Sequence, residues 1–315
     1  MTPVPEFTVQ QMSRKALQLT LDWAAREGWQ PGLHDGEAFY AADPKGYFQA
    51  TAKGRGGAVT DNGTPTSNPD DIENMLGSIS AVAHGDRFGF IGLFIVDKSY
   101  RGHRIGSALA SAALDRLGDR VIGVDGVLKK ASQYKSIYGF EFAWINIRHE
   151  WRPDARKSAS VPPDQVPDLE FVTISESNFA EAEQLDLKYF MAPRPEFLKH
   201  WLYPSTHEGG LALLCRQAGE PAGYGVLRPS VSGYRIGPLF AANDAAAEGL
   251  FHRLTVGLPP DAVVWMDIPD AHPEARAFAK KQGMIEMFPT ARMYRGGKWP
   301  LCARNIWGIT TLELG

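Results

Sequence analysis

The chain carries one series of landmarks twice, and this repetition constrains its fold more than any other feature. Each series begins with an apolar strand pattern interrupted by a glycine, Gly92 in the first half and Gly237 in the second. An apolar run that ends in an aspartate follows, at Asp125 and at Asp267, and a closing glycine comes 47 positions after Gly92 and 46 positions after Gly237. Three landmarks in the same order favour two α+β domains of one ancestry. The alternative is that two unrelated α/β domains happen to have strands and glycines at similar spacings.

The length of the chain agrees with two domains. Its 315 residues suit two domains of roughly 150 residues each. The stretch 151–169 is rich in Pro, Asp, Ser and Lys, a composition typical of an interdomain linker. We therefore expect an N-terminal domain at 1–150 and a C-terminal domain at 170–315.

Charge, hydropathy and cysteine content exclude several classes of protein. A net charge of −3 argues against a nucleic-acid binder with a basic face. The longest apolar run, 88–96, is far shorter than the roughly 20 residues of a membrane span, and the N-terminus does not resemble a signal peptide. Cys215 and Cys302 are too few for a disulfide framework or a thiolate zinc cage, and the histidines show no metal or triad spacing. We expect a cytoplasmic protein without a metal, nucleic-acid or membrane partner.

Local patterns predict most elements of the first half. The expected helices are 13–27, 105–117 and one that ends at 138, and the expected strands are 47–52, 77–83, 88–96, 120–127 and 144–147. Ser13 and Gly28 are placed to begin and end the first helix. His84 lies in the turn between two strands and is expected to be solvated. The Gly-, Thr- and Ser-rich stretch 54–71 is predicted to be a long mobile loop, either a lid or an insertion.

The segment between the strand 88–96 and the next helix is predicted to bind a phosphate. It reads Asp97-Lys98-Ser99-Tyr100-Arg101-Gly102-His103-Arg104-Ile105-Gly106. A helix N-terminus offers unpaired N–H groups and a positive dipole end, glycines let the backbone approach an anion, and basic side chains add donors. The spacing excludes a P-loop and a Rossmann fingerprint. The alternative is a basic loop that enters a helix by chance, with Gly106 serving only packing.

The stretch 96–109 resembles motif A of the GNAT N-acetyltransferase superfamily, whose pattern is Arg/Gln-x-x-Gly-x-Gly/Ala. Arg101, Ile105 and Gly106 fit, whereas Arg104 stands where the first glycine is usual. The resemblance continues to Tyr138-Gly139-Phe140, and 223–240 is similar to the C-terminal half of tandem GNAT proteins. It implies two tandem GNAT-like domains of mixed α/β structure, each a mostly antiparallel mixed sheet flanked by helices.

The same resemblance implies acetyl-CoA, or another acyl-CoA, as donor and an amine as acceptor. The CoA pyrophosphate would bind the N–H groups of 103–107, and the pantetheine arm would pair with the backbone of 94–96, between this strand and the next. The thioester carbonyl would accept a backbone N–H near Phe94, a donor worth about 3 kcal/mol. The residues assigned to the donor site are Phe94, Ile95, Val96, Arg101, Gly102, His103, Arg104, Ile105, Gly106 and Ser107.

Two proton transfers require an acid and a base. In the superfamily the acid is commonly a tyrosine four residues before the closing glycine. Lys135 holds that offset and Tyr134 precedes it, so Tyr134 is chosen as the acid that protonates the departing thiolate. Asp125, at the end of its strand, is the candidate base, with helix capping as the alternative.

The second half is expected not to bind the donor. Its segment 240–249 has no arginine and no glycine pair, and Asn243 or Asp244 would cap the helix. Pro238 removes an amide beside the position of the oxyanion donor. This half is instead expected to close the acceptor pocket from strand-end or loop positions. The candidates are Arg228, Tyr224, Asp267 and the segment Tyr189-Phe190-Met191-Ala192-Pro193-Arg194.

These observations predict an N-acyltransferase that acetylates a primary amine of a small molecule or peptide by direct attack. No cysteine lies near the proposed site, which argues against a thiol intermediate. A non-catalytic acyl-CoA-binding or regulatory protein is the first alternative, and a structural or partner-binding α/β protein is the second.

Overall fold

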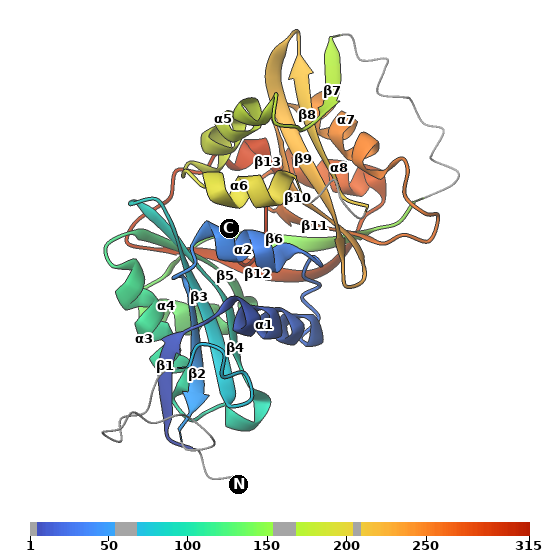
Figure 1. Cartoon of the computed structure of the whole chain (residues 1–315). Helices are drawn as coiled ribbons and strands as arrows, with labels where there is room; N and C mark the ends of the chain where they lie inside the picture. Colours follow the sequence, from blue (N-terminus) through green and yellow to red (C-terminus); the bar gives the residue numbers. More distant parts are fainter. Residues whose placement is uncertain (1–4, 54–67, 154–167, 204–208) are drawn as a thin grey trace.

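The computed structural model describes residues 5–53, 68–153, 168–203 and 209–315 (Figure 1). Most of the expected loop at 54–71 and of the expected linker at 151–169 therefore lies outside the described residues. Figure 1 shows the first half, in blue to green, and the second half, in yellow to red, as two lobes that meet along α2 and α6.

The first half forms the elements that local patterns predicted and two that they did not, the strand Phe7–Gln11 and the helix Asp35–Ala42. They are β1 (Phe7–Gln11), α1 (Arg14–Arg26), α2 (Asp35–Ala42), β2 (Tyr47–Ala52), β3 (Met75–His84), β4 (Phe88–Val96), α3 (Ile105–Leu117), β5 (Val121–Val127), α4 (Ala131–Tyr138) and β6 (Glu141–Trp151). Ser13 caps α1 by accepting a hydrogen bond from the Ala16 amide at 3.2 Å. α3 agrees with its expected range because Ile105, Leu109 and Leu117 form one buried face.

The second half repeats the same run of elements. It contains β7 (Leu169–Thr173), α5 (Phe179–Phe190), α6 (Pro195–Leu202), β8 (Leu211–Gln217), β9 (Glu220–Ser230), β10 (Gly233–Ala241), α7 (Asp244–Thr255), β11 (Val264–Pro269), α8 (Pro273–Gln282), β12 (Ile285–Arg295) and β13 (Ile306–Gly308). The series β10-α7-β11-α8 corresponds to β4-α3-β5-α4. Gly139 and Gly283 end the two closing helices with left-handed φ angles of 72° and 74°.

Strands of both halves join one 13-stranded sheet. Its order is β1-β2-β3-β4-β5-β12-β6-β11-β10-β9-β8-β7, with β13 paired to β10. β12, from the second half, lies between β5 and β6 of the first half, and β6 in turn pairs with β11. Each half thus contributes a strand to the other half's part of the sheet.

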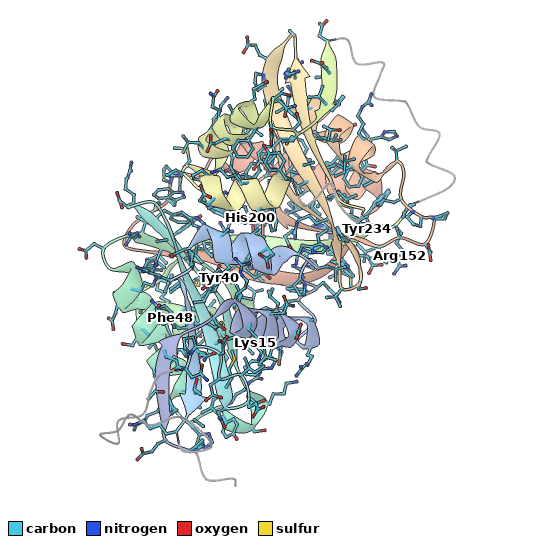
Figure 2. All side chains as sticks on the ribbon, viewed as in Figure 1. Lys15, Tyr40, Phe48, Arg152, His200 and Tyr234 are labelled. Atoms are coloured by element: carbon cyan, nitrogen blue, oxygen red, sulfur yellow. The ribbon has the colours of Figure 1, made fainter. Side chains whose placement is uncertain are left out.

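Helices and buried side chains also connect the halves. α3 covers one face of the first-half strands, while α1 and α2 lie over the other face. α2 packs on α6, where the rings of Phe39 and Trp201 stack with centroids 6.1 Å apart. Figure 2 labels Tyr40 and His200 on these two helices. Within the described ranges, none of the helices is long and apolar enough to cross a membrane.

Candidate active site

β4 and β5 form a parallel pair that opens into a cleft. The two strands pair only as far as Ile91 and Val124, although β4 continues to Val96 and β5 to Val127. A bulge in the β3–β4 ladder accompanies a left-handed φ of 46° at Leu93, where the strands part. Among the described strands, none pairs with this side of β4 beyond Ile91. The free edge can therefore hydrogen-bond an extended ligand as an added strand would.

The N-terminus of α3 lies at the open end of this cleft, and no side chain caps it. Arg104 occupies the N-cap position with φ 64° and makes no capping hydrogen bond. This left-handed conformation explains why a glycine is usual here. Gly102 is also left-handed, with φ 85°. The uncapped N–H groups of the first turn are free to bind an anion.

Arg101 fixes the loop that leads into α3. Its Nε donates to the Val96 carbonyl at 2.9 Å, and its Nη2 lies 3.1 Å from a Glu27 carboxylate oxygen. His103 and Arg104 are exposed, and within the described residues their side chains have no partner. Arg101 is therefore bound within the protein, whereas the donors of His103 and Arg104 are free of protein partners in the described residues.

Tyr134 packs against the end of β5, whereas its neighbour Lys135 does not. The Tyr134 ring lies against Gly126 near the end of β5, only 2.7 Å from where a Cβ atom would stand. Lys135 instead reaches Glu141 at 3.0 Å. Burial, with a smaller contribution from Tyr138, raises the pKa of Tyr134 to about 12. The phenol is therefore protonated at neutral pH, as a general acid must be.

Asp125 lies at the cleft, but both of its carboxylate oxygens are already bound. Arg292 donates to each of them at 2.7 Å, and Asn146 donates to one at 2.8 Å. Burial alone would lower the pKa of Arg292, but the charge of Asp125 raises it. Asp125 does not cap α4 either, since that helix has no side-chain cap. The pair joins β5 to β12 and leaves Asp125 poorly placed to act as a base.

The expected acceptor residues are not at strand ends, which corrects the sequence prediction. Tyr224, Arg228 and Asp267 lie within β9 and β11 and are 0%, 5% and 3% exposed. Their side chains pack inward against charged groups of the other elements, and the local pattern could not indicate this. Arg228 pairs with Asp35 of α2 and lies over the Trp201 ring at 3.8 Å. Its Nε and Nη2 atoms have no hydrogen-bond partner.

The other two candidates belong to buried polar networks. Asp267 accepts hydrogen bonds from Arg148 at 2.8 Å and from Arg235 at 2.6 Å. In the segment 189–194, Arg194 forms a bidentate pair with Asp186, which also accepts from the Tyr224 hydroxyl. These contacts hold the second half together beside the first.

His84 is buried, not solvated as the turn predicted. It is 2% exposed, and its Nε2 lies 3.1 Å from the Leu314 carbonyl oxygen. Burial, followed by the charge of Arg194, lowers its pKa to about 3. The cause is the segment 309–314, which covers the end of β3 from more than 200 positions away and leaves no local signal.

In the second half, the chain itself fills the corresponding cleft. β10 and β11 pair in parallel only to Ile236 and Met266, and β13 then pairs with β10 in the gap. The Ile309 amide donates to the Asp267 carbonyl at 2.9 Å on the other side. The side chain of Asn243 caps α7 by accepting from the Ala246 amide at 3.0 Å. The second cleft is closed, and its helix N-terminus is occupied.

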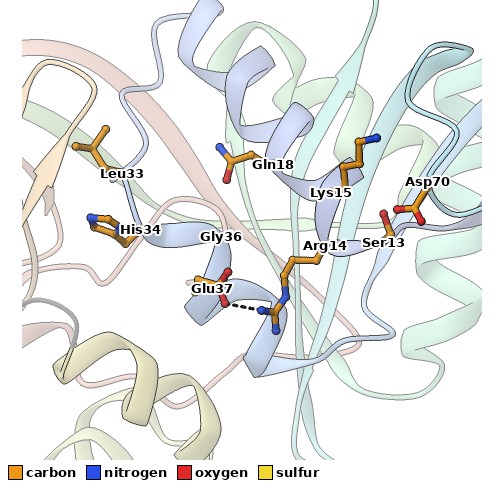
Figure 3. A pocket seen from close by; sticks show the side chains of 9 residues that line it. All are labelled: Ser13, Arg14, Lys15, Gln18, Leu33, His34, Gly36, Glu37 and Asp70. Atoms are coloured by element: carbon orange, nitrogen blue, oxygen red, sulfur yellow. Dashed lines mark hydrogen bonds and ion pairs between the residues drawn. The ribbon is translucent and has the colours of Figure 1, made fainter.

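A separate cavity of about 670 Å³ lies at the N-terminal ends of α1 and α2 (Figure 3). Both positively and negatively charged side chains line it, and Arg14 and Glu37 form an ion pair of 2.8 Å there. The sequence did not predict this cavity. The lining residues are Ser13, Arg14, Lys15, Gln18, Leu33, His34, Gly36, Glu37 and Asp70. Across the described residues, no group of three His, Cys, Asp or Glu side chains is arranged to hold a metal ion.

A splayed parallel strand pair with a helix at its open end, built twice in one chain, defines a tandem acyltransferase fold. Family comparison agrees, because residues 34–133 match the acetyltransferase (GNAT) family and residues 182–308 match an acetyltransferase (GNAT) domain. The chain belongs to the GNAT superfamily and is a tandem GNAT protein.

Three known proteins align with nearly the whole of this chain. A protein named holothin acyltransferase, from Pseudoalteromonas sp. (strain SANK 73390), is 28% identical over 98% of this chain and 95% of its own. A putative acetyltransferase from Pyrococcus horikoshii has a similar structure, with a TM-score of 0.73 at 18% identity over 100% of this chain and 99% of its own. A tandem GNAT protein from the clavulanic acid biosynthesis pathway aligns with a TM-score of 0.61 at 14% identity, over 93% and 100% of the two chains. The last two matches bear on the fold alone.

Proposed function

We propose that this protein is an N-acyltransferase that transfers an acetyl group from acetyl-CoA to a primary amine of a small molecule or peptide. The observation that carries the proposal is the difference between the two clefts. The β4–β5 cleft is open and ends at an uncapped helix, whereas β13 fills the β10–β11 cleft and Asn243 caps α7. One donor site per chain follows, and it lies in the first half.

In this cleft the donor would lie along the free edge of β4. The pyrophosphate would bind the first-turn N–H groups of α3, with His103 and Arg104 as further donors. The pantetheine arm would pair with the backbone of Phe94–Val96. The thioester carbonyl would accept an N–H beside the bulge at Leu93, where a fixed donor stabilises the developing oxyanion.

The reaction would proceed by direct attack of the amine on the thioester carbon. The C–N bond forms, the C–S bond breaks, and Tyr134 gives its proton to the departing thiolate. The nitrogen loses one proton in the same reaction, and this proton restores the Tyr134 phenol. A cysteine intermediate is disfavoured because neither cysteine lies on β4 or β5. Cys215 is buried in β8, where burial raises the pKa of its thiol to about 12, and Cys302 is exposed in the second half, before β13. The acyltransferase name of the 28% identical relative supports acyl transfer as the reaction.

The acceptor would enter on the face of β4 that carries α1, α2 and the second half. Arg228 supports this placement because it is buried between α2 and α6 and has two nitrogens, Nε and Nη2, without a hydrogen-bond partner. Unpaired buried donors are costly, and a polar acceptor would satisfy them.

Calorimetric titration with CoA tests the donor site. We expect one CoA per chain, and Gly106→Glu should weaken binding more than 100-fold, since a carboxylate about 5 Å from a phosphate costs about 3 kcal/mol at an effective dielectric of 20. A Cβ at Gly106 meets the Phe94 ring at an ordinary 3.4 Å, so the fold should tolerate the change. Gly257→Glu, in open space in the second half, is the matched control. Equal affinity in both variants would contradict the proposal.

Thiol release from acetyl-CoA with a panel of primary amines tests the chemistry. Amine-dependent release supports an N-acyltransferase. CoA binding without release by any amine would favour the alternative, a non-catalytic acyl-CoA-binding or regulatory protein.

A further inference from the structure

Glu313 is a buried carboxylate without a partner. It is 4% exposed, and its Oε2 has no hydrogen bond. Within the described residues, no cation lies within ion-pair distance of it. Buried carboxylates are normally paired because desolvation of an unpaired charge is costly. A site that binds a cationic ligand explains such a carboxylate without requiring a structural role.

The position of Glu313 links it to the acyl-transfer cleft. Its backbone lies against Gly92, next to the bulge at Leu93, and its carbonyl oxygen is 2.1 Å from where a Gly92 Cβ would stand. Gly92 faces the side of β4 that is opposite α3, because the α3 residue Leu117 lies instead against Gly89. Glu313 therefore lies on the acceptor side of the strand that would hold the thioester.

The segment that carries Glu313 is firmly anchored at both sides. Thr311 Oγ1 accepts hydrogen bonds from the backbone amides of Glu313, at 3.2 Å, and of Leu314, at 2.9 Å. Arg194 donates to Thr310 Oγ1 at 2.9 Å, and the Leu314 carbonyl contacts His84. The backbone that carries Glu313 is thus held in position before any ligand arrives.

Four charged groups face Glu313 from four elements, and none of them neutralises it. Arg148 of β6 and Arg235 of β10 are already bound to Asp267 of β11, and Asp35 of α2 is bound to Arg228. Burial, the largest effect, raises the pKa of Glu313, and Asp35 and Asp267 raise it further. Arg235 and Arg148 lower it, but the net change is upward. A carboxylate with a raised pKa is a better proton acceptor near neutral pH.

From this geometry we infer that Glu313 binds the ammonium group of the acceptor and removes its proton before acyl transfer. The inference rests on the proposed function. The N–H bond of the ammonium breaks and its proton goes to the Glu313 carboxylate, directly or through one water. The neutral amine then forms the C–N bond and the C–S bond breaks. Tyr134 protonates the thiolate, and the second proton lost by the nitrogen returns to the Tyr134 phenolate. Glu313 then gives its proton to solvent, so that one proton is released per turnover.

The first test is the pH dependence of thiol release for wild type and Glu313→Gln, with acetyl-CoA and the best amine of the panel. Wild-type kcat/KM should level off above the pKa of Glu313. In the variant, kcat/KM at pH 7 should be lower than that of wild type by about 100-fold or more. It should then rise tenfold per pH unit until the pH reaches the amine's own pKa of about 10. CoA affinity should not change. Glu220→Gln, an exposed glutamate of β9, is the matched control.

The second test measures unfolding by urea as a function of pH and needs no acceptor. When the native state raises the pKa of a carboxyl group, the protein loses stability as the pH rises from the group's usual pKa of 4.5 through its native pKa. Wild type should therefore lose stability relative to Glu313→Gln across that range, because the variant has no buried carboxylate. A structural ion pair would give the opposite sign, with the variant less stable at neutral pH.

The outcomes separate the inference from the proposed function. A wild type that releases thiol, with a Glu313→Gln variant that keeps its rate and its pH plateau, overturns the inference and leaves the proposed function standing. A variant less stable than wild type at pH 7 also overturns it. A wild type that binds no CoA overturns both. Glu313→Asp, which keeps the charge but shortens the side chain, should recover the pH plateau at a lower rate if the fold is intact.

Discussion

Asp267 is predicted to be one of the strongest links between the two halves. Its carboxylate accepts three charge-assisted hydrogen bonds, two from Arg148 of the first half at 2.8 Å and one from Arg235 at 2.6 Å. Asp267→Ala leaves two buried guanidinium groups without their counter-ion. Removing one partner of a buried ion pair costs about 3–5 kcal/mol. That loss is a large fraction of a typical stability of roughly 5–15 kcal/mol.

Urea unfolding followed by tryptophan fluorescence measures this loss. We expect a melting temperature lower by roughly 6–10 °C as well, because each kcal/mol shifts a domain of this size by about 2 °C. Glu248→Gln removes an exposed pair with Lys281 and is the matched control, with an expected loss below about 1 kcal/mol. CoA affinity of the folded variant should be unchanged, since Asp267 lies outside the β4–β5 cleft. An Asp267→Ala loss as small as that of the control would refute the reasoning.

Two further predictions concern single side chains. Tyr134→Phe should lower kcat about 100-fold with unchanged CoA affinity, because it removes only the proton for the thiolate; an unaltered kcat in the thiol-release assay would exclude Tyr134 as the acid. His84 is neutral in the native state, with a pKa of about 3, and titrates at 6.5 when unfolded. Wild type should therefore lose about 1.4 kcal/mol per pH unit relative to His84→Gln as pH falls below 6.5; parallel stability curves between pH 6.5 and 4 would contradict this.

The elements around the donor cleft could be predicted from sequence because their signals are local. β4 agrees with its expected range, and the buried face of α3 and the glycine after it fix that helix at both ends. The capped N-terminus of α7 could be predicted for the same reason, since Asn243 stands directly before the helix. The motif alone led to the expectation that Arg101 binds phosphate, whereas the structure commits most of its guanidinium to Val96 and Glu27.

The features that sequence reasoning missed depend on contacts between distant segments. β12 enters the first-half sheet between β5 and β6, and it brings Arg292 to Asp125 across 167 positions. β13 fills the second cleft, and the segment after it buries His84 and places Glu313 beside Gly92. Hydrophobic periodicity and turn residues report only local structure and therefore cannot predict contacts between such distant segments. The repeat itself was the available clue, since a second copy without the anion loop raises the question of what occupies its cleft.

A crystal structure of the protein with bound CoA tests the central claim most directly. We predict the carrier between β4 and β5, with its pyrophosphate on the first turn of α3 and its pantetheine along the backbone of Phe94–Val96. CoA seated between β10 and β11 in place of β13, or bound at neither cleft, would contradict the account.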